Sequence, residues 1–230
     1  MTEGPNSREL ALGILMEVTG QEEYSHIALR NVLEKYRYLS KQERAFLTRL
    51  TEGTLEWMLH LDYIINQFSN VKVNKMKPVI RNILRMSVYQ LKFMNSVPAS
   101  AVCNEAVKLA VKKGFRGLKG FVNGVLRNIA RQLSEVVYPD KREAVPYLSV
   151  MYSMPEWIVE DWLKTYGRDM TERILQAFLE KEPLSIRPNL ERIAPDRLKE
   201  ALEQQGITVT QAAWPDYALR IENYNYLGAI

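Results

Sequence analysis

The chain has 230 residues and a formal net charge of +4, and 47% of its residues are hydrophobic, so it can bury a substantial core and is not composed like a disordered protein. One cysteine, Cys103, and two distant histidines, His26 and His60, exclude an intramolecular disulfide and predict no metal site. No stretch is apolar enough for a signal peptide or a membrane span, so we expect a cytoplasmic protein.

The first half of the chain has the apolar spacing of consecutive helices. The predicted helices begin at or near Asn6, Ser25, Ser40, Pro78, Ser100 and Leu118. The segment after Ser40 is too long for one ordinary helix, and we expect a break near Leu59–Leu61. Gly114 is expected to end the helix that Ser100 caps. Six or seven helices with short connections predict a mainly α protein with an all-α bundle over residues 1–135.

The second half of the chain has a different pattern, in which short strands are predicted as well as helices. Residues 136–152 contain two prolines in a charged stretch and are predicted as a linker. Ser153 as N-cap, followed by Pro155 and Glu156, predicts a helix start, and Gly167 separates this helix from a second one. A short strand, a helix and two further strands are then expected at Leu184–Pro188, Pro195–Gln205, Ile207–Gln211 and Ala218–Asn223. Residues 153–230 therefore read as a helix pair and a small, incomplete α+β domain. The apolar end, Tyr226–Ile230, either docks onto that domain or marks a cut.

The basic residues are concentrated in one stretch. Between Asp62 and Glu135 lie thirteen Lys and Arg residues and one acid, Glu105, so this stretch carries +12 and, with a total of +4, the rest carries −8. A one-signed block in an otherwise acidic chain predicts a polyanionic partner, and nucleic acid is the first hypothesis. The alternative is a solvated helical face whose charges serve only solubility.

The predicted RNA-contacting residues come from this block. They are Lys72, Lys75, Lys77, Lys108, Lys112, Lys113, Arg116, Lys119, Arg127 and Arg131. Arg116 and Lys119 lie in a glycine-rich loop, where the backbone can approach a phosphate closely. For Lys112 and Lys113 there is an alternative, because cations are favoured at a helix C-terminus in any protein.

Three other residues in this region are predicted to have structural roles. Glu105 is predicted to form an ion pair with Arg127 or Arg85, and Cys103 to be a core residue, not a nucleophile. Gly124, inside a helix, predicts close packing at that point. No phosphate-binding loop or nucleophile motif occurs, so no catalytic residue is predicted in this chain.

Two sets of motifs carry a family resemblance. Val97-Pro98, the helix that contains Asn104–Val107 and the segment Phe121–Arg127 resemble the NusB-type all-helical RNA-binding domain. Further along, Ser153–Ile158 and Leu184–Asn189, together with a Tyr-Gly pair between them, resemble the RsmB (Sun/Fmu) family of 16S rRNA cytosine-C5 methyltransferases.

The resemblance implies the RNA-recognition part of an S-adenosylmethionine-dependent methyltransferase that acts on small-subunit rRNA. It also implies a doubly wound catalytic domain with two cysteines, one adding to cytosine as a thiolate and the other assisting product release. The sequence contains neither those cysteines nor a glycine-rich cofactor loop. We therefore expect the 230 residues alone to bind rRNA, to bind no cofactor and to be inactive.

Three alternative functions are also compatible with the sequence. A stand-alone transcription antitermination factor of NusB type would bind RNA and a small protein, but would not need residues 153–230. A purely interacting protein would place a partner helix in an apolar groove of the bundle. The basic block could also dock onto the protein's own C-terminal catalytic domain, where one is present.

Overall fold

The structure, a computed structural model, describes residues 6–21, 23–180, 184–212 and 214–222. The expectations for the end of the chain, from Asn223 onward, lie outside these residues. The chain divides into two compact units, at the step from Ala177 to Phe178. Within the described part of the chain, no helix is long and apolar enough to cross a membrane.

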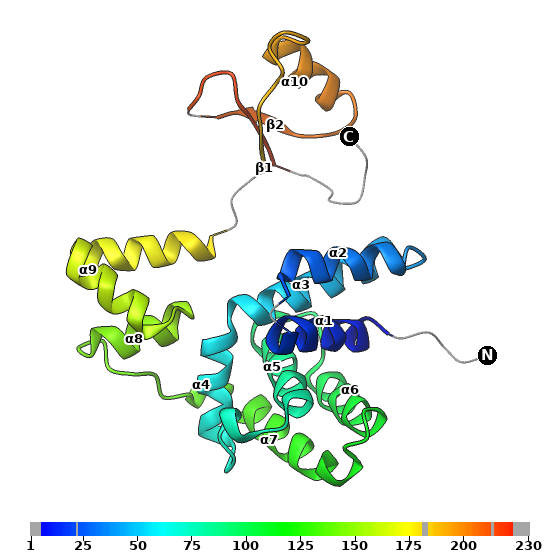
Figure 1. The fold of residues 1–230 in the computed structure, drawn as a ribbon, viewed down its shortest axis with the longest axis vertical. Coiled ribbons are helices and arrows are strands. Elements are labelled where there is room, and N and C mark those ends of the chain that lie inside the picture. Colours follow the sequence, from blue (N-terminus) through cyan, green and yellow to red (C-terminus); the bar gives the residue numbers. More distant parts are fainter. Residues whose placement is uncertain (1–5, 22, 181–183, 213, 223–230) are drawn as a thin grey trace. The chain divides into compact units, whose positions relative to one another are not determined.

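The first unit is helical (Figure 1). Its α-helices are α1 (Ser7–Gln21), α2 (Ser25–Lys35), α3 (Lys41–Glu56), α4 (Met58–Phe68), α5 (Pro78–Phe93), α6 (Ala99–Lys112), α7 (Lys119–Gln132), α8 (Ala144–Tyr152) and α9 (Glu156–Leu179), which continues into the second unit. Short 3-10 turns are η1 (Val73–Lys75), η2 (Arg116–Leu118) and η3 (Leu133–Glu135). Among the described residues up to Gln132 there are seven α-helices, so the predicted all-α bundle is confirmed.

Local capping explains several of these boundaries. The backbone N–H of Glu9 donates to Asn6 Oδ1 at 2.9 Å, and Ser40 forms the predicted reciprocal capping box with Glu43. Two predictions were wrong in detail. The break falls at Trp57 instead of Leu59–Leu61, and Trp57 packs its ring onto Phe93, with ring centroids 4.7 Å apart. Helix α6 begins before Ser100, after an N-cap proline without a side-chain cap.

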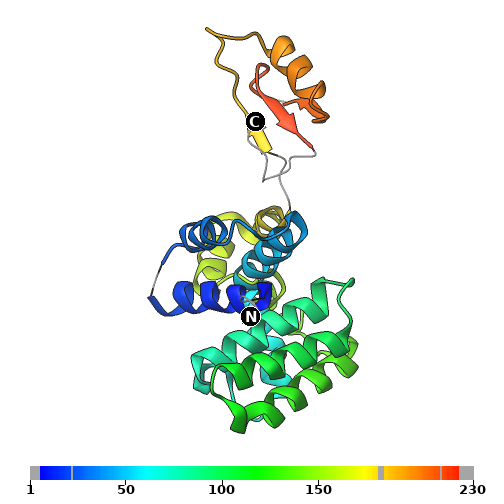
Figure 2. The ribbon, with the colours of Figure 1, turned by 90° about the vertical axis from the view of Figure 1, so that its right-hand side faces the viewer.

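Helix α5 is the central element of the bundle. It packs against α1, α3, α4, α6 and α7, and Figure 2 shows α5, α6 and α7 running side by side. Every residue from Asn82 to Gln90 is buried, although the run includes an arginine, two amides and a serine. Buried polar groups are costly unless they are paired, so α5 requires internal partners.

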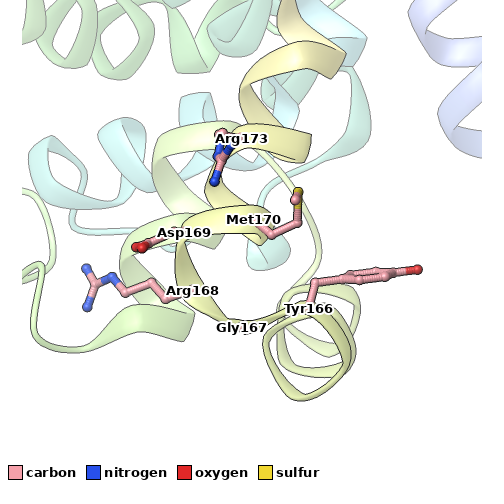
Figure 3. A pocket seen from close by; sticks show the side chains of 6 residues that line it. All are labelled: Tyr166, Gly167, Arg168, Asp169, Met170 and Arg173. Carbon is pink, nitrogen blue, oxygen red and sulfur yellow. The ribbon is translucent and has the colours of Figure 1, made fainter.

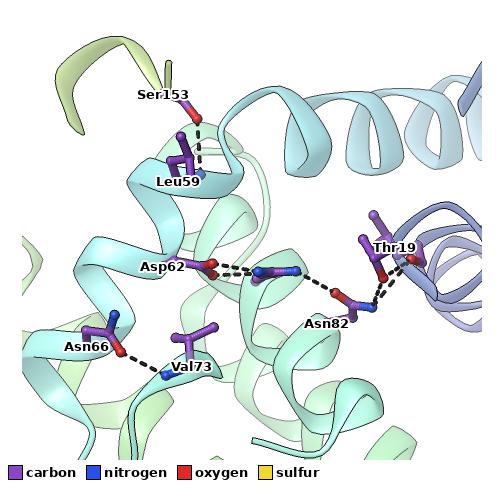
Figure 4. Close-up of polar contacts among 9 residues, drawn as sticks. Thr19, Leu59, Asp62, Asn66, Val73, Asn82 and Ser153 are labelled. Carbon is purple, nitrogen blue, oxygen red and sulfur yellow. Dashed lines mark hydrogen bonds and ion pairs between the residues drawn. The ribbon is translucent and has the colours of Figure 1, made fainter. Parts of the chain in front are cut away.

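A connected polar network supplies those partners (Figure 4). Arg85 on α5 donates to both carboxylate oxygens of Asp62 on α4, at 2.7 Å from Nε and 2.5 Å from Nη2. Its Nη1 donates to Asn82 Oδ1 at 3.2 Å, and the Asn82 amide donates to Thr19 Oγ1 on α1 at 2.9 Å. The network therefore joins three helices through one buried guanidinium.

Helices α3 and α5 approach each other closely at Gly53. A Cβ atom placed on Gly53 of α3 would lie 2.1 Å from the ring carbon Cζ of Tyr89, a buried residue of α5. Only glycine allows this approach. The prediction of close packing at Gly124 was wrong, because a Cβ there would have no atom of another described element within 4 Å.

The segment predicted as a linker, 136–152, contains helix α8, which packs against α4. His60 of α4 donates from Nδ1 to the Val150 carbonyl at 2.8 Å, and burial lowers the pKa of His60 to about 4 although this hydrogen bond opposes the shift. Ser153 does not cap α9 as predicted. It ends α8 with φ of 53°, and its hydroxyl accepts the N–H of Leu59 at 3.2 Å.

The described part of the second unit contains the end of α9, a small sheet and one other helix. After α9, its elements are β1 (Leu184–Ile186), α10 (Pro195–Glu203), β2 (Val209–Gln211) and β3 (Leu219–Ile221), each within a few residues of its predicted position. The strands are antiparallel in the order β1-β3-β2, with Leu184 and Val209 on either side of Ile221. Leu202 of α10 packs with Val209 and Leu219 in a separate small core.

Replacing Asp62 by Asn keeps the shape of the side chain and removes the charge that pairs with Arg85. Breaking a buried pair from one side typically costs about 3–5 kcal/mol. Because the Asp62 side chain is 20% exposed, we expect D62N to lower the free energy of unfolding by about 2–3 kcal/mol. Urea denaturation followed by far-UV circular dichroism measures this change. E135Q, at an exposed acid, is the control, and equal effects of the two variants would contradict the buried-pair assignment.

The different surroundings of Gly53 and Gly124 predict opposite effects of substitution by alanine. Alanine is favoured over glycine in a helix by about 1 kcal/mol, so G124A should stabilise the protein by up to that amount. G53A should instead destabilise it by about 1–3 kcal/mol, because the new methyl group overlaps the ring of Tyr89. Thermal or urea unfolding of both variants tests this, and a stabilising G53A would show that the ring moves away without cost.

Candidate nucleic-acid interface

The structure divides the thirteen cations of the basic block into internal and external groups. Arg85 is buried against Asp62. Lys92 is half-buried and donates from Nζ to the Tyr138 hydroxyl at 3.1 Å, while Arg81 is also half-buried. These cations support the bundle, so the field that a polyanion would meet is smaller than the sequence count indicates.

Lys112 and Lys113, at the C-terminal end of α6, are bound to Glu9 in the first turn of α1. Their Nζ atoms lie 2.6 and 3.0 Å from the two carboxylate oxygens of Glu9. Burial alone would raise the pKa of Glu9, but the hydrogen bonds and charges of the two lysines outweigh it and hold that pKa below its ordinary value. Glu9 was not predicted as a partner of these lysines. The signal for it in the sequence is an acid in the first turn of the first helix.

Lys108 is also paired inside the molecule. Its Nζ lies 2.8 Å from Glu105 Oε1, one helical turn away on α6. Glu105 therefore forms an ion pair, as predicted, but its predicted partners were wrong. Arg85 is held by Asp62, and Arg127 donates from Nε to Asn123 Oδ1 at 3.0 Å.

Arg127 and Arg131 of α7 lie on the same face, one turn apart, and share one cavity. The cavity has a volume of about 280 Å³, and its other lining residues are Ala99, Ser100, Cys103 and Ala130. Ala99 and Ser100 belong to the first turn of α6, where backbone N–H groups have no acceptor within the helix. Two guanidinium groups beside such a turn form a surface suited to an anion.

Cys103 forms part of this cavity but is a core residue, as predicted. It is 3% exposed, and burial raises the pKa of its thiol although the charge of Arg127 acts in the opposite direction. The thiol is therefore protonated and not a nucleophile.

The remaining predicted contacts are exposed. Arg116 and Lys119 lie in and after η2, next to Gly114, whose φ of 88° ends α6. Lys72, Lys75 and Lys77 lie in and around η1, in the connection between α4 and α5. Among the described residues, these five and the arginine pair of α7 have no ion-pair partner.

The ten predicted residues therefore lie in three places and not in one cluster. Three lysines are paired along α6, four cations lie on the α6–α7 connection and α7, and three lysines lie at the α4–α5 connection. Helix α7 packs against both α4 and α6 and so links these places within the first unit.

Other features of the described residues do not form a cofactor or metal site. Gly167, with φ of 72°, bends α9 and separates two helical segments, as predicted. A cavity of about 320 Å³ at this bend is drawn in Figure 3, where Tyr166 and Arg168 point in opposite directions, so its lining groups do not converge. The described residues contain no group of three or more metal-ligating side chains. Their sheet is antiparallel, so it lacks the crevice at the carboxyl ends of parallel strands that binds nucleotide cofactors in doubly wound folds.

Two family models match the chain. Residues 5–131 match the NusB family, and residues 154–226 match the Methyltr_RsmF/B-like, ferredoxin-like domain. The fold and the matches together define a NusB-type helical domain joined to an RsmF/B-like domain. The chain belongs to the NusB family, and the combination of its two domains is that of the N-terminal region of the RsmB family.

Relatives agree with this assignment along nearly the whole chain. The probable ribosomal RNA small subunit methyltransferase B of Bacillus subtilis (strain 168) is 33% identical over 93% of this chain and 47% of its own length. The probable enzyme of the same name from Synechocystis sp. (strain ATCC 27184 / PCC 6803 / Kazusa) is 31% identical over 94% of this chain and 48% of its own length. The chain thus spans about half the length of the curated relatives that it matches.

Solved structures share the fold. The crystal structure of PH0851 aligns with 97% of this chain and 50% of that chain, with a TM-score of 0.66 at 18% identity. The crystal structure of the antitermination factors NusB and NusE in complex with dsRNA aligns with 54% of this chain and 93% of that chain, with a TM-score of 0.50 at 25% identity.

Reversing Lys112 and Lys113 should destabilise the fold. K112E/K113E places two further acids beside Glu9 at the contact between α1 and α6, and we expect a loss of about 1–2 kcal/mol in the free energy of unfolding. R116E/K119E makes the same change in charge at exposed positions and should leave stability within about 0.5 kcal/mol of wild type. Urea unfolding compares the two variants.

Two further variants test the assigned partner. E9K should restore stability to K112E/K113E, because it reverses both signs of the contact. E9Q should destabilise the protein at neutral pH and match wild type in acid. The pKa of Glu9 is lowered by folding, so its contribution is present above the ordinary carboxyl pKa and is lost as the pH falls through the folded value. No recovery by E9K would contradict the pairing.

Proposed function

We propose that this chain is the RNA-recognition part of an S-adenosylmethionine-dependent rRNA (cytosine-C5) methyltransferase that acts on small-subunit rRNA. The observation that carries the proposal is the pairing of a NusB-family helical domain with an RsmF/B-like domain in one chain. A stand-alone NusB-type antitermination factor is not favoured, because the second domain matches methyltransferase relatives along with the first.

The chain's own contribution is RNA binding and not methyl transfer. Cys103 is buried as a thiol and has no role as a nucleophile. The described residues offer no cradle for the methyl donor. Methyl transfer would therefore require a catalytic domain as a partner of this chain, and that domain would supply the cofactor site and the reacting cysteines.

We assign the phosphate contacts to the unpaired cations. Arg127 and Arg131 carry the main contact, because they border one cavity together with the first turn of α6. Arg116 and Lys119 extend the same surface, and Lys72, Lys75 and Lys77 form a second contact. The relative whose structure contains dsRNA supports duplex RNA as the ligand class. Such contacts add affinity that depends on salt and only weakly on sequence.

The lysines of α6 are assigned a different role. Lys112 and Lys113 would have to leave Glu9 before contacting RNA, and Lys108 would have to leave Glu105. The exchange of one anion for another adds little affinity. We therefore rank these three lysines below the unpaired cations as RNA contacts.

R127E/R131E should weaken binding to rRNA at least about tenfold and reduce the slope of log K against log salt by about 2, one for each phosphate contact. The probes are labelled small-subunit rRNA hairpins of about 30–40 nucleotides, whose stems of about 13–18 bp are comparable to the roughly 16 bp that one duplex-binding domain spans. Fluorescence anisotropy over a salt series measures both quantities.

R30E/R37E is the matched control, because it makes the same change in charge at exposed positions on and after α2. It should change the affinity by no more than about threefold, through long-range charge that salt screens. Wild-type affinity of R127E/R131E would overturn the assignment of the arginines to RNA and favour their docking onto a catalytic domain.

A further inference from the structure

A separate groove in the first unit lies among α4, α8 and α9. It has a volume of about 660 Å³ and is lined by residues from all three helices. Leu59, Tyr63 and Asn66 follow one another at helical spacing, so one face of α4 forms its wall. Figure 4 shows Leu59 and Asn66 on that helix. None of the ten predicted RNA-contacting residues lines this groove.

The opposite wall presents an exposed indole. Trp157, near the start of α9, is 71% exposed, whereas Trp57 in the bundle packs against aromatic neighbours. A tryptophan left mostly in water beside a groove is a surface anchor for a partner, because indole combines a large apolar area with a strong cation–π face.

Two acids flank this indole. Glu156 and Glu160 lie one helical turn apart on α9, and both line the groove with Trp157. Like charges at this spacing repel, and neither carboxylate has an ion-pair or hydrogen-bond partner among the described residues. The third acid of the groove, Asp62, is held by Arg85 and is not available.

We propose that this groove binds a cationic protein segment, one that presents Lys or Arg side chains next to an apolar residue. The cationic groups would lie over Trp157 and between Glu156 and Glu160, and the apolar residue would contact Leu59. The charge of the wall repels RNA phosphates, so the partner here differs in class from the polyanion proposed for α7. This inference stands on the groove alone and does not depend on the proposed function.

The test uses the full 230-residue chain and a short fluorescein-labelled peptide of alternating Arg and Leu. Addition of the peptide should shift the indole N–H resonance of Trp157, which is assigned by its loss in W157F. E156Q/E160Q keeps the side-chain shapes and should weaken binding at least about threefold, from the loss of two exposed ion pairs. A peptide with Gln in place of Arg should bind more weakly to the wild-type chain.

D196N/E200Q is the matched control, because these two acids have the same spacing in the first turns of α10 and do not line the groove. It should leave the affinity unchanged. Equal losses from the two acid pairs would mean general attraction to a negative surface and would overturn the proposal. So would an unshifted Trp157 resonance, or a shift caused by the rRNA hairpin instead of the peptide.

Discussion

The bundle depends on a buried guanidinium at its centre. Helix α5 packs against five other helices and Arg85 is buried, at 7% exposure, so its charge must be neutralised inside the protein. Asp62 supplies the charge and Asn82 extends the network to Thr19 of α1. Because each member has its donors and acceptors arranged by the others, the network specifies how α1, α4 and α5 pack as well as contributing to stability.

Pairing with an internal acid also decides which cations are available to a ligand. A cation that already has an internal acid gains little from a phosphate, whereas an unpaired cation gains the full interaction. Lys112 and Lys113 join α6 to α1 through Glu9, so they belong to the scaffold. Arg127 and Arg131 have no ion-pair partner among the described residues, and they border a shared cavity. The cations of the basic block thus divide into those that hold the scaffold together and exposed ones, which we propose as the contact surface.

The first unit also separates charges of opposite sign. Its α7 surface is cationic, and the groove between α4 and α9 presents Glu156 and Glu160 beside Trp157. Surfaces of opposite sign on one unit would suit the two partners that we propose, because each surface repels the ligand proposed for the other. Helix α8 makes the second surface possible, since its hydrogen bonds to His60 and Leu59 hold it against α4.

The sequence by itself determined the family and most of the elements, because their signals act over a few residues. Helix α8, in the segment predicted as a linker, is the exception. The capping box at Ser40 and the end of α6 at Gly114 could be predicted from local spacing, as could the basic character of the site. Only the tertiary structure decided that Glu9 holds two of the predicted RNA contacts, and that Gly53 instead of Gly124 needs to be glycine. Both facts depend on which faces of α1 and α6, and of α3 and α5, pack together. The helices of each pair are far apart in the sequence, so no local pattern predicts how their faces pack.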